Sequence, residues 1–279
     1  MEFFNVCGVR ISTINLDTAC EKISRWINEG KKRYICVAPV STIVECQRDP
    51  DYLNIVNQAG MVTPDGMPLV WLGRWGGDKR IKRTYGPDLM LSLCALSQSK
   101  GYRHFFYGGT PQTCHLLERK LKTKFPQLEI VGWYSPSFIE LPVNKQDSQS
   151  PDSIRRLGAG KEKLNNSVFT EERDEVLEEI NRLKPDILWV GLGSPKQDYW
   201  MYHHRGKLEV PVMVGVGAAF DFLSGQKKQA PFWMQRTGLE WLFRFFCEPK
   251  RLWRRYLIGN TQFFYFLLRD FLKGKKTDE

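Results

Sequence analysis

The sequence has no apolar run long enough to cross a membrane. The nearest candidate, Tyr256 to Phe271, is interrupted by Asn260, Arg269 and Asp270, whereas a spanning helix needs about 18 to 20 apolar residues. The first residues also lack the basic start and apolar centre of a signal peptide. We therefore expect neither a membrane-spanning helix nor a secretory leader, and we expect a cytoplasmic protein.

Patterns that hold metals are missing too. The seven cysteines are scattered without a CxxC pair, and the four histidines form no HxxxH pair. An odd number of dispersed cysteines is typical of reduced, mostly buried thiols, and zinc sites need closely spaced ligands. We expect no disulfide framework and no metal site.

The charge is far from balanced. Across 279 residues, 41 lysines and arginines outnumber 31 acidic residues, for a formal net charge of +10. This surplus favours an anionic partner, which composition leaves open between nucleic acid, an anionic lipid surface and a phosphorylated substrate. No RNP, KH or zinc-finger pattern accompanies the charge, so nucleic acid is disfavoured.

Strand and helix signals alternate along the chain. Short apolar runs between turn residues predict strands, and periodic apolar positions after capping residues predict helices. This rhythm predicts an α/β fold, a Rossmann-like and mostly parallel sheet with helices on both faces, whose ligand sites lie at the carboxyl ends of strands. The predicted strands are Tyr34–Val37, Arg103–Tyr107, one beginning at Ile130, Ile187–Gly191 and Pro211–Val216, and helices are predicted after Asp17, Gly86, Thr110, Thr170 and Ser194.

Two stretches interrupt the alternation. Residues 140–169 are polar, and we interpret them as a surface insertion. From about Ala230 basic and aromatic side chains interleave, so we predict a core over residues 1–230 and a helical basic-aromatic appendage over 231–279. Such helices suit the headgroup boundary of an anionic membrane, although the same composition also fits core packing, a solvated face or a surface for single-stranded nucleic acid.

One carboxylate stands between a proline and a glycine, in Thr63-Pro64-Asp65-Gly66. Loops with such fixed backbones often carry catalytic groups, and Asp65 is suited to act as a general base toward a hydroxyl. The alternative is a plain turn, in which the carboxylate bonds nearby backbone. The pattern alone favours that alternative.

Gly108, Gly109 and Thr110 join a predicted strand to a predicted helix. Glycine permits close backbone approach, and a helix N-terminus offers free N–H groups to an anion such as a diphosphate. We take these three residues as candidate substrate-binding residues. An ordinary strand-to-helix turn explains them equally well.

Gly193, Ser194, Lys196 and Gln197 repeat this arrangement and add a lysine and an amide. Lys196 or Gln197 is suited to hold a phosphate or a sugar hydroxyl. The alternative for Ser194 and Gln197 is a capping box that only starts a helix.

The appendage carries three arginines, Arg244, Arg251 and Arg254, that fall close to one helical face if Pro249 kinks the segment. Arginine presents forked donors suited to phosphate oxygens. These positions are therefore candidates for holding a diphosphate, with a solvated basic face as the alternative.

Taken in order, the motifs resemble the WecG/TagA/CpsF glycosyltransferase family from about Asn5 to Phe264. The GSPKQ, FDF, LEW and EPKR blocks together are highly specific. The matching blocks are Val62–Gly66 (VTPDG), Tyr85–Met90 (YGPDLM), Phe106–Gly109 (FYGG), Val190–Gln197 (VGLGSPKQ), Val216–Phe222 (VGAAFDF), Gln229–Met234 (QAPFWM), Leu239–Arg244 (LEWLFR) and Glu248–Tyr256 (EPKRLWRRY).

The resemblance implies an inverting glycosyltransferase. It would move a sugar from a UDP-sugar to a polyprenyl-diphosphate-linked saccharide, in exopolysaccharide, teichoic acid or common antigen synthesis. The enzyme would lie on the inner face of the cell membrane and bind an anionic membrane surface through the appendage. It would need no cofactor besides the donor, and a homo-oligomer is possible.

The resemblance also implies residue roles. Asp65 would be the general base, Gln197 would lie at the active site, and Arg83 would be a basic residue of the pocket. Arg244, Arg251 and Arg254 would close over the diphosphate. Without the resemblance, the alternative is a non-catalytic nucleotide or nucleic-acid binding module that uses the same basic tail.

A nicotinamide oxidoreductase is the third hypothesis. Gly215 and Gly217 form half of a dinucleotide fingerprint, but Phe220 stands where that fingerprint needs glycine or alanine. Close packing of a helix on a strand explains the two glycines adequately, so this hypothesis is disfavoured.

Overall fold

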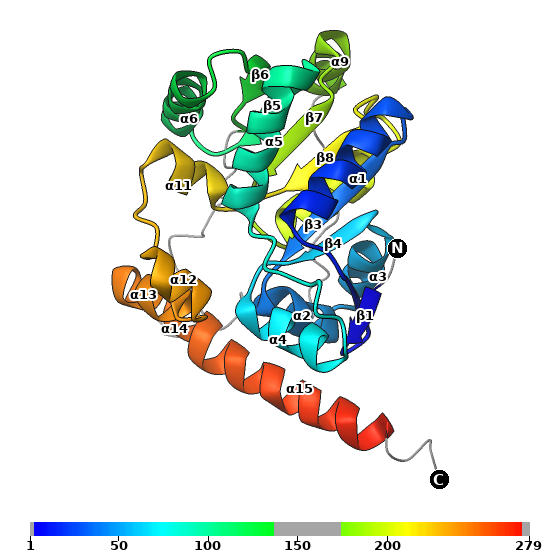
Figure 1. Ribbon diagram of the computed structural model, residues 1–279, viewed down its shortest axis with the longest axis vertical. Coiled ribbons are helices and arrows are strands. Elements are labelled where there is room, and N and C mark those ends of the chain that lie inside the picture. Colours follow the sequence, from blue (N-terminus) through cyan, green and yellow to red (C-terminus); the bar gives the residue numbers. More distant parts are fainter. Residues whose placement is uncertain (1–2, 137–173, 275–279) are drawn as a thin grey trace, which may run out of the picture.

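The computed structural model describes residues 3–136 and 174–274, with the backbone alone at 251, 254, 255, 273 and 274. Its centre is a six-stranded sheet of order β4-β3-β8-β7-β5-β6, in which every neighbouring pair is parallel (Figure 1). The predicted α/β fold with a parallel sheet is thereby confirmed. The strands are β3 (Arg33–Ala38), β4 (Met61–Pro64), β5 (Arg103–Gly108), β6 (Glu129–Tyr134), β7 (Ile187–Gly191) and β8 (Val212–Gly215).

The central strands are apolar on both faces because helices cover both. Successive residues of β3 alternate between two cores: Tyr34 and Cys36 join one, and Ile35 and Val37 join the other. This period of two follows from the pleat of a strand. Helices on both faces, as predicted, are therefore confirmed.

Each face has its own set of helices (Figure 1). The core that contains Ile35 is completed by α1 (Leu16–Asn28), α5 (Gly86–Lys100), α6 (Pro111–Lys124) and α11 (Ala219–Ser224). The core that contains Tyr34 is completed by α2 (Val40–Arg48), α3 (Pro50–Gln58), α9 (Asp174–Leu183) and α10 (Lys196–His204).

An antiparallel hairpin precedes the sheet and was not predicted. It pairs β1 (Phe3–Val6) with β2 (Val9–Ser12). The Ser12 hydroxyl accepts the Val62 N–H at 3.1 Å, which attaches the hairpin to β4. The helix α4 (Met67–Trp75), also not predicted, follows β4 directly.

Two predicted helix starts are wrong in detail. The first helix is capped by Asn15 and not by Asp17, because Asn15 and Thr18 form a reciprocal capping box. The helix α10 has Pro195 at its N-cap and no side-chain cap, so the Ser194–Gln197 capping box is absent. The predicted insertion at 140–169 and the predicted start after Thr170 lie outside the described residues.

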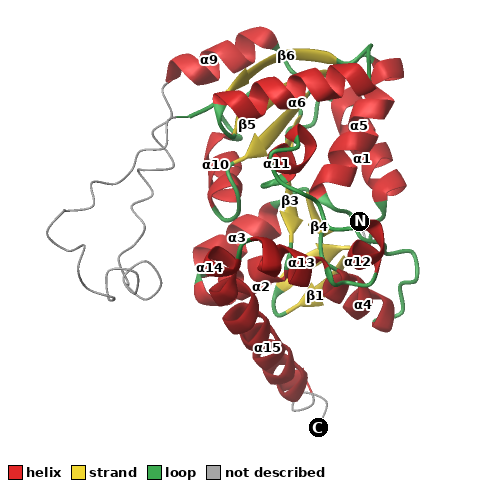
Figure 2. Cartoon of the chain, turned by 90° about the vertical axis from the view of Figure 1, so that its left-hand side faces the viewer, coloured by secondary structure: helices red, strands yellow, loops and turns green. Residues whose placement is uncertain are grey.

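The C-terminal segment is helical, which confirms the predicted helical appendage. Its last helix packs on α2 at the end of the molecule opposite β6 and α9 (Figure 2). Across the described residues, no helix has both the length and the apolar character that crossing a membrane requires. The elements are α12 (Phe232–Arg236), α13 (Glu240–Cys247), α14 (Pro249–Trp253), the π-helical η1 (Arg254–Ile258) and α15 (Gly259–Gly274).

Candidate active site

The candidate residues of the core gather at one edge of the sheet. Asp65 directly follows β4, Gly108 ends β5, Gly193 lies just beyond β7, and Gly217 lies just beyond β8. All six strands run in the same direction, so these four positions share the carboxyl edge. Open parallel sheets bind ligands at that edge.

Asp65 is held as an extension of the sheet. Its N–H donates to the Ala38 carbonyl at 3.2 Å, and its own carbonyl accepts the Arg83 Nε–H at 2.5 Å. The Arg83 Nη2 atom also lies 4.0 Å from Asp65 Oδ1. The Asp65 side chain is mostly buried and lies beside a cation.

Arg83 in turn contacts the appendage. Its Nη2 atom pairs with the Glu240 carboxylate of α13, and its Nη1 atom donates to Gln235 Oε1 at 3.4 Å. Arg244 Nη1 approaches the other Glu240 oxygen at 4.0 Å. The fold therefore brings Arg83 and Arg244 to one buried carboxylate, which the sequence analysis did not single out although it lies in the LEW block.

The two guanidinium groups stay charged in these surroundings. Burial by itself would lower the pKa of Arg83, but the carboxylates of Asp65 and Glu240 raise it above its usual value. Burial would likewise lower the pKa of Arg244, and Tyr256, Tyr85, Glu240 and Asp65 raise it. The site thus combines two fixed cations with two carboxylates.

Tyr85 lies in the same group and was not predicted. The Arg83 guanidinium covers its ring at 4.0 Å, and burial, with the charges of Glu240 and Asp65, raises the pKa of its phenol. The buried Tyr85 hydroxyl has no hydrogen-bond partner among the described atoms. Buried hydroxyls are nearly always paired in folded proteins, so this one is an exception next to the candidate base.

The loops after β5 and β7 approach each other closely. Gly108 has φ +116°, and a Cβ there would lie 2.8 Å from the Gly191 backbone. Gly109 has φ +69°, and its carbonyl accepts the Ser135 hydroxyl at 2.6 Å. Both glycines are thus required by backbone conformation, and Gly108 also by packing.

Between β5 and β7 the connections of the sheet change sides. The helix after β5, α6, lies on one face, and the helix after β7, α10, lies on the other. Such a switch point opens a crevice between neighbouring strand ends. Thr110 caps α6 there by accepting the Thr113 N–H at 3.1 Å.

Gln197 links two loops of the carboxyl edge. Its side chain is buried, and its Oε1 accepts the N–H groups of Gly193 at 3.1 Å and Gly217 at 2.8 Å. Its Nε2 donates to the Ser194 hydroxyl at 3.2 Å. A Cβ at Gly215 would lie 2.8 Å from Nε2, so the packing explanation of that glycine holds. Ser194 and Lys196 themselves are exposed.

Asp198 lies beneath the loops and was missed by the sequence analysis. It is fully buried, and its Oδ2 accepts the Tyr52 hydroxyl at 2.7 Å. Burial raises the pKa of Asp198 to about 6, although hydrogen bonds from Tyr52, Cys36, Ser194 and Gln197 oppose that rise. A signal was present in the sequence, since an acidic residue directly follows Gln197.

Of the three appendage arginines, the structure describes the side chain of Arg244. Arg244 is half-buried in α13, with its guanidinium 5.4 Å from the Phe222 ring centre. Arg251 belongs to α14 and Arg254 to η1. The side chains of Arg251 and Arg254 lie outside the described part of the structure.

Within the described residues, no group of three or more His, Cys, Asp or Glu side chains is placed to hold a metal ion. The Asp49-Pro50-Asp51 triplet has the Asp-x-Asp spacing of some metal sites. Asp49 instead caps α3, by accepting the N–H groups of Asp51 at 3.0 Å and Tyr52 at 3.1 Å. It also accepts the Tyr199 hydroxyl at 2.6 Å, so its oxygens serve the fold.

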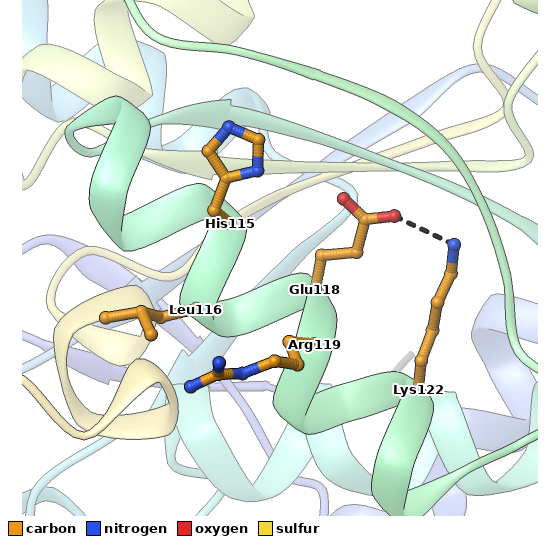
Figure 3. Close-up of a pocket in the computed structure, with 5 residues that line it drawn as sticks. All are labelled: His115, Leu116, Glu118, Arg119 and Lys122. Carbon is orange, nitrogen blue, oxygen red and sulfur yellow. Dashed lines mark hydrogen bonds and ion pairs between the residues drawn. The ribbon is translucent and has the colours of Figure 1, made fainter.

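Two surface hollows lie away from these residues. One, of about 400 Å³, lies between β6 and α9. The other, of about 410 Å³, is lined by one face of α6, where Glu118 and Lys122 pair at 2.8 Å (Figure 3). Neither is lined by a candidate residue. The candidate site is therefore described by the residues at the carboxyl edge, Asp65, Arg83 and Glu240, and not by either hollow.

Comparison with known proteins shows which family the chain belongs to. The model of the "Glycosyl transferase WecG/TagA/CpsF family" matches residues 4–277. The chain is similar to proteins named N-acetylglucosaminyldiphosphoundecaprenol N-acetyl-beta-D-mannosaminyltransferase. The one from Bacillus subtilis is 27% identical over 75% of this chain and 69% of the relative. The one from Bacillus spizizenii is 28% identical, over 83% and 77%, and that from Staphylococcus aureus 25%, over 73% and 67%. The chain therefore belongs to the WecG/TagA/CpsF family of glycosyltransferases.

Proposed function

We propose that this enzyme transfers a hexose of the N-acetylmannosamine type from a UDP-sugar to a polyprenyl-diphosphate-linked saccharide, with inversion at the anomeric carbon. The single observation that carries the proposal is the placement of Asp65 at the carboxyl edge, against Arg83, which in turn pairs with Glu240. The names of the relatives support the acceptor class, since they specify N-acetylglucosaminyldiphosphoundecaprenol.

Asp65 acts as the general base. Its carboxylate takes the proton of the acceptor hydroxyl while that oxygen forms a bond to the anomeric carbon. The bond from the anomeric carbon to the UDP oxygen breaks in the same step, and UDP leaves with the electron pair. Arg83 fixes the Asp65 backbone carbonyl and so orients the carboxylate.

The departing diphosphate needs positive charge, which is the main electrostatic requirement of the reaction. We assign its place to the carboxyl ends of β5 and β7, where Gly108 packs on Gly191 and where Gly109, Thr110 and Gly193 follow the two strands. The N-terminus of α6 and the exposed Lys196 favour an anion there. Arg244 supplies positive charge from the appendage, and we assign Arg251 and Arg254 to the same task.

Gln197 is a positioning residue in this scheme. Its amide bonds the loops after β7 and β8 to each other, so it shapes the crevice rather than contacting the sugar. The appendage closes over the site and excludes water, which protects the UDP-sugar from hydrolysis. We assign the enzyme to the inner face of the cell membrane, and a polyprenyl-linked acceptor supports a place at the membrane.

The test is sugar transfer from a panel of UDP-sugars to a GlcNAc-diphosphate lipid. Asp65→Asn should lower turnover by about 10²- to 10⁴-fold, the usual contribution of general base catalysis. Asp17→Asn, an exposed carboxylate on α1, is the matched control and should keep full turnover. Unchanged turnover in Asp65→Asn, with UDP-sugar binding intact, would remove Asp65 from the mechanism.

A further inference from the structure

The helix α4 exposes two tryptophans that no substrate-binding role explains. Trp71 is 50% exposed and Trp75 is 89% exposed, and their spacing of four residues puts them on one face of the helix. The opposite face is fixed to the core through buried Leu69 and Gly73. A Cβ at Gly73 would lie 2.9 Å from the Phe4 ring, so the helix has no room to turn its tryptophans inward.

The appendage also exposes aromatic residues, on a helix near α4. Phe232 and Trp233 of α12 are 71% and 61% exposed, and α12 lies beside α4 in both views (Figures 1 and 2). The turn after α12 contacts α4 directly, since a Cβ at Gly238 would lie 3.0 Å from the Trp71 ring. We call Trp71, Trp75, Phe232 and Trp233 the α4–α12 surface.

Basic residues border the α4–α12 surface. Between positions 74 and 82 the chain has four cations, all exposed, and one carboxylate, Asp78, which pairs with Arg80 at 2.8 Å. Arg236 of α12 is exposed as well and lies 5.5 Å from the Phe232 ring centre. The four cations are Arg74, Lys79, Arg80 and Lys82.

The composition of the α4–α12 surface favours an anionic lipid bilayer as its binding partner. Protein–protein interfaces are depleted in lysine, whereas tryptophans bordered by both lysine and arginine suit the headgroup layer of an anionic bilayer. We propose that the α4–α12 surface docks on an anionic lipid bilayer, so that a helix of the core anchors the enzyme together with the appendage. This inference rests on the proposed lipid-linked acceptor.

The position of α4 connects this anchor with the chemistry. Asp65 stands just before the first turn of α4, and Trp75 is the last residue of the helix. Nine helical residues span roughly 14 Å. Docking through Trp71 and Trp75 therefore holds Asp65 within about the length of α4 from the lipid headgroups. The sugar of a diphosphate-linked lipid extends from the bilayer into this region.

The experiment is sedimentation of the full chain with vesicles of phosphatidylcholine alone or with 30% phosphatidylglycerol. Trp71→Ala/Trp75→Ala should weaken binding to the anionic vesicles about tenfold or more, whereas Trp71→Phe/Trp75→Phe, which keeps an aromatic ring at both positions, should retain most of it. Arg74→Glu should weaken binding mainly at low salt. Arg119→Glu, an exposed arginine on α6 at the far end of the molecule, should bind as the wild type does.

Thermal unfolding should be unchanged in the double variant, because both side chains are exposed. Vesicle binding at the wild-type level by the double tryptophan variant would overturn the inference. It would also be overturned if the wild type bound no vesicles and instead formed a concentration-dependent dimer that the double variant loses. A short-chain, water-soluble acceptor separates this inference from the proposed function. The variant should transfer sugar to that acceptor at the wild-type rate, whereas failure of the wild type itself on every acceptor would count against the function.

Discussion

The carboxylate of Glu240 pairs with the guanidinium of Arg83. The two residues are 157 positions apart in the chain, one in the appendage and one just before α5. Arg83 also binds the backbone carbonyl of Asp65. The residue that orients the candidate base is therefore itself held by the appendage, so appendage position and base orientation are linked through one side chain.

Glu240→Gln should test this link. The change leaves two partly buried guanidiniums, those of Arg83 and Arg244, with less negative charge nearby. We expect the free energy of unfolding to fall by about 2 kcal/mol, less than the ~3–5 kcal/mol of a fully buried pair because Arg83 and Glu240 retain some exposure. Urea unfolding measures the change. Glu179→Gln removes an exposed pair with Arg182 and should leave the midpoint unchanged; an equal effect of both variants would contradict the link.

Tyr85→Phe should not destabilise the protein. The Tyr85 hydroxyl is buried without a partner, and an unsatisfied buried hydroxyl costs about 1–3 kcal/mol. We expect the variant to gain about 1 kcal/mol in urea unfolding. A loss of stability would show that the hydroxyl has a partner in solution. A hydroxyl that donates to a bound substrate oxygen contributes to the reaction. In that case Tyr85→Phe should lower kcat for sugar transfer more than it lowers the affinity for UDP.

Gln197→Ala should disconnect the loops after β7 and β8. Two buried N–H groups, those of Gly193 and Gly217, lose their acceptor, so we expect a loss of about 2 kcal/mol and weaker UDP binding. Calorimetric titration with UDP measures the second effect. Gln58→Ala on α3, whose side chain bonds Asn54 at the surface, is the control. Wild-type affinity in Gln197→Ala would mean that the loops hold their shape without the amide.

Asp198→Asn should change how stability depends on pH. The carboxyl has a pKa near 3.8 in an unfolded chain and about 6 in the fold, chiefly because of burial. Ionisation therefore costs free energy only in the folded state, and the cost appears as pH rises through that window, reaching about 3 kcal/mol above it. The variant should gain little over the wild type at pH 4 and most at pH 7, as followed by urea unfolding. A gain that is the same at both pH values would contradict the raised pKa.

Much of the architecture could be predicted from local pattern. Tyr34–Val37 and Ile187–Gly191 are recognisable as strands because they are short apolar runs. Pro87 favours a helix start because it lies in the first turn of α5, and Thr110 caps α6 directly. Asp65 stood out because it lies between a proline and a glycine, and Gly108 and Gly193 stood out because each follows a predicted strand. Parallel strands bring their carboxyl ends together. These signals come from residues close together in the sequence, so they can be recognised without knowing how the rest of the chain folds.

Other features depended on which of several hydrogen-bond partners each side chain finds in the folded chain. Asn15 displaced Asp17 as a cap because its partner Thr18 completes a reciprocal pair. Gln197 left the predicted capping box because two loop N–H groups approach its oxygen more favourably. Both choices are competitions between nearby hydrogen-bond partners, and the outcome depends on backbone geometry that the sequence pattern does not specify.

By itself the sequence determined the parallel sheet, the line of candidate residues along its carboxyl edge, and a basic, aromatic, helical C-terminus. Only the tertiary structure decided that Glu240 joins Arg83 to Arg244, and that the exposed tryptophans of α4 border α12. Periodicity and capping act over a few residues, whereas a charge pair or a surface shared by two helices exists only after the chain has brought distant segments into contact.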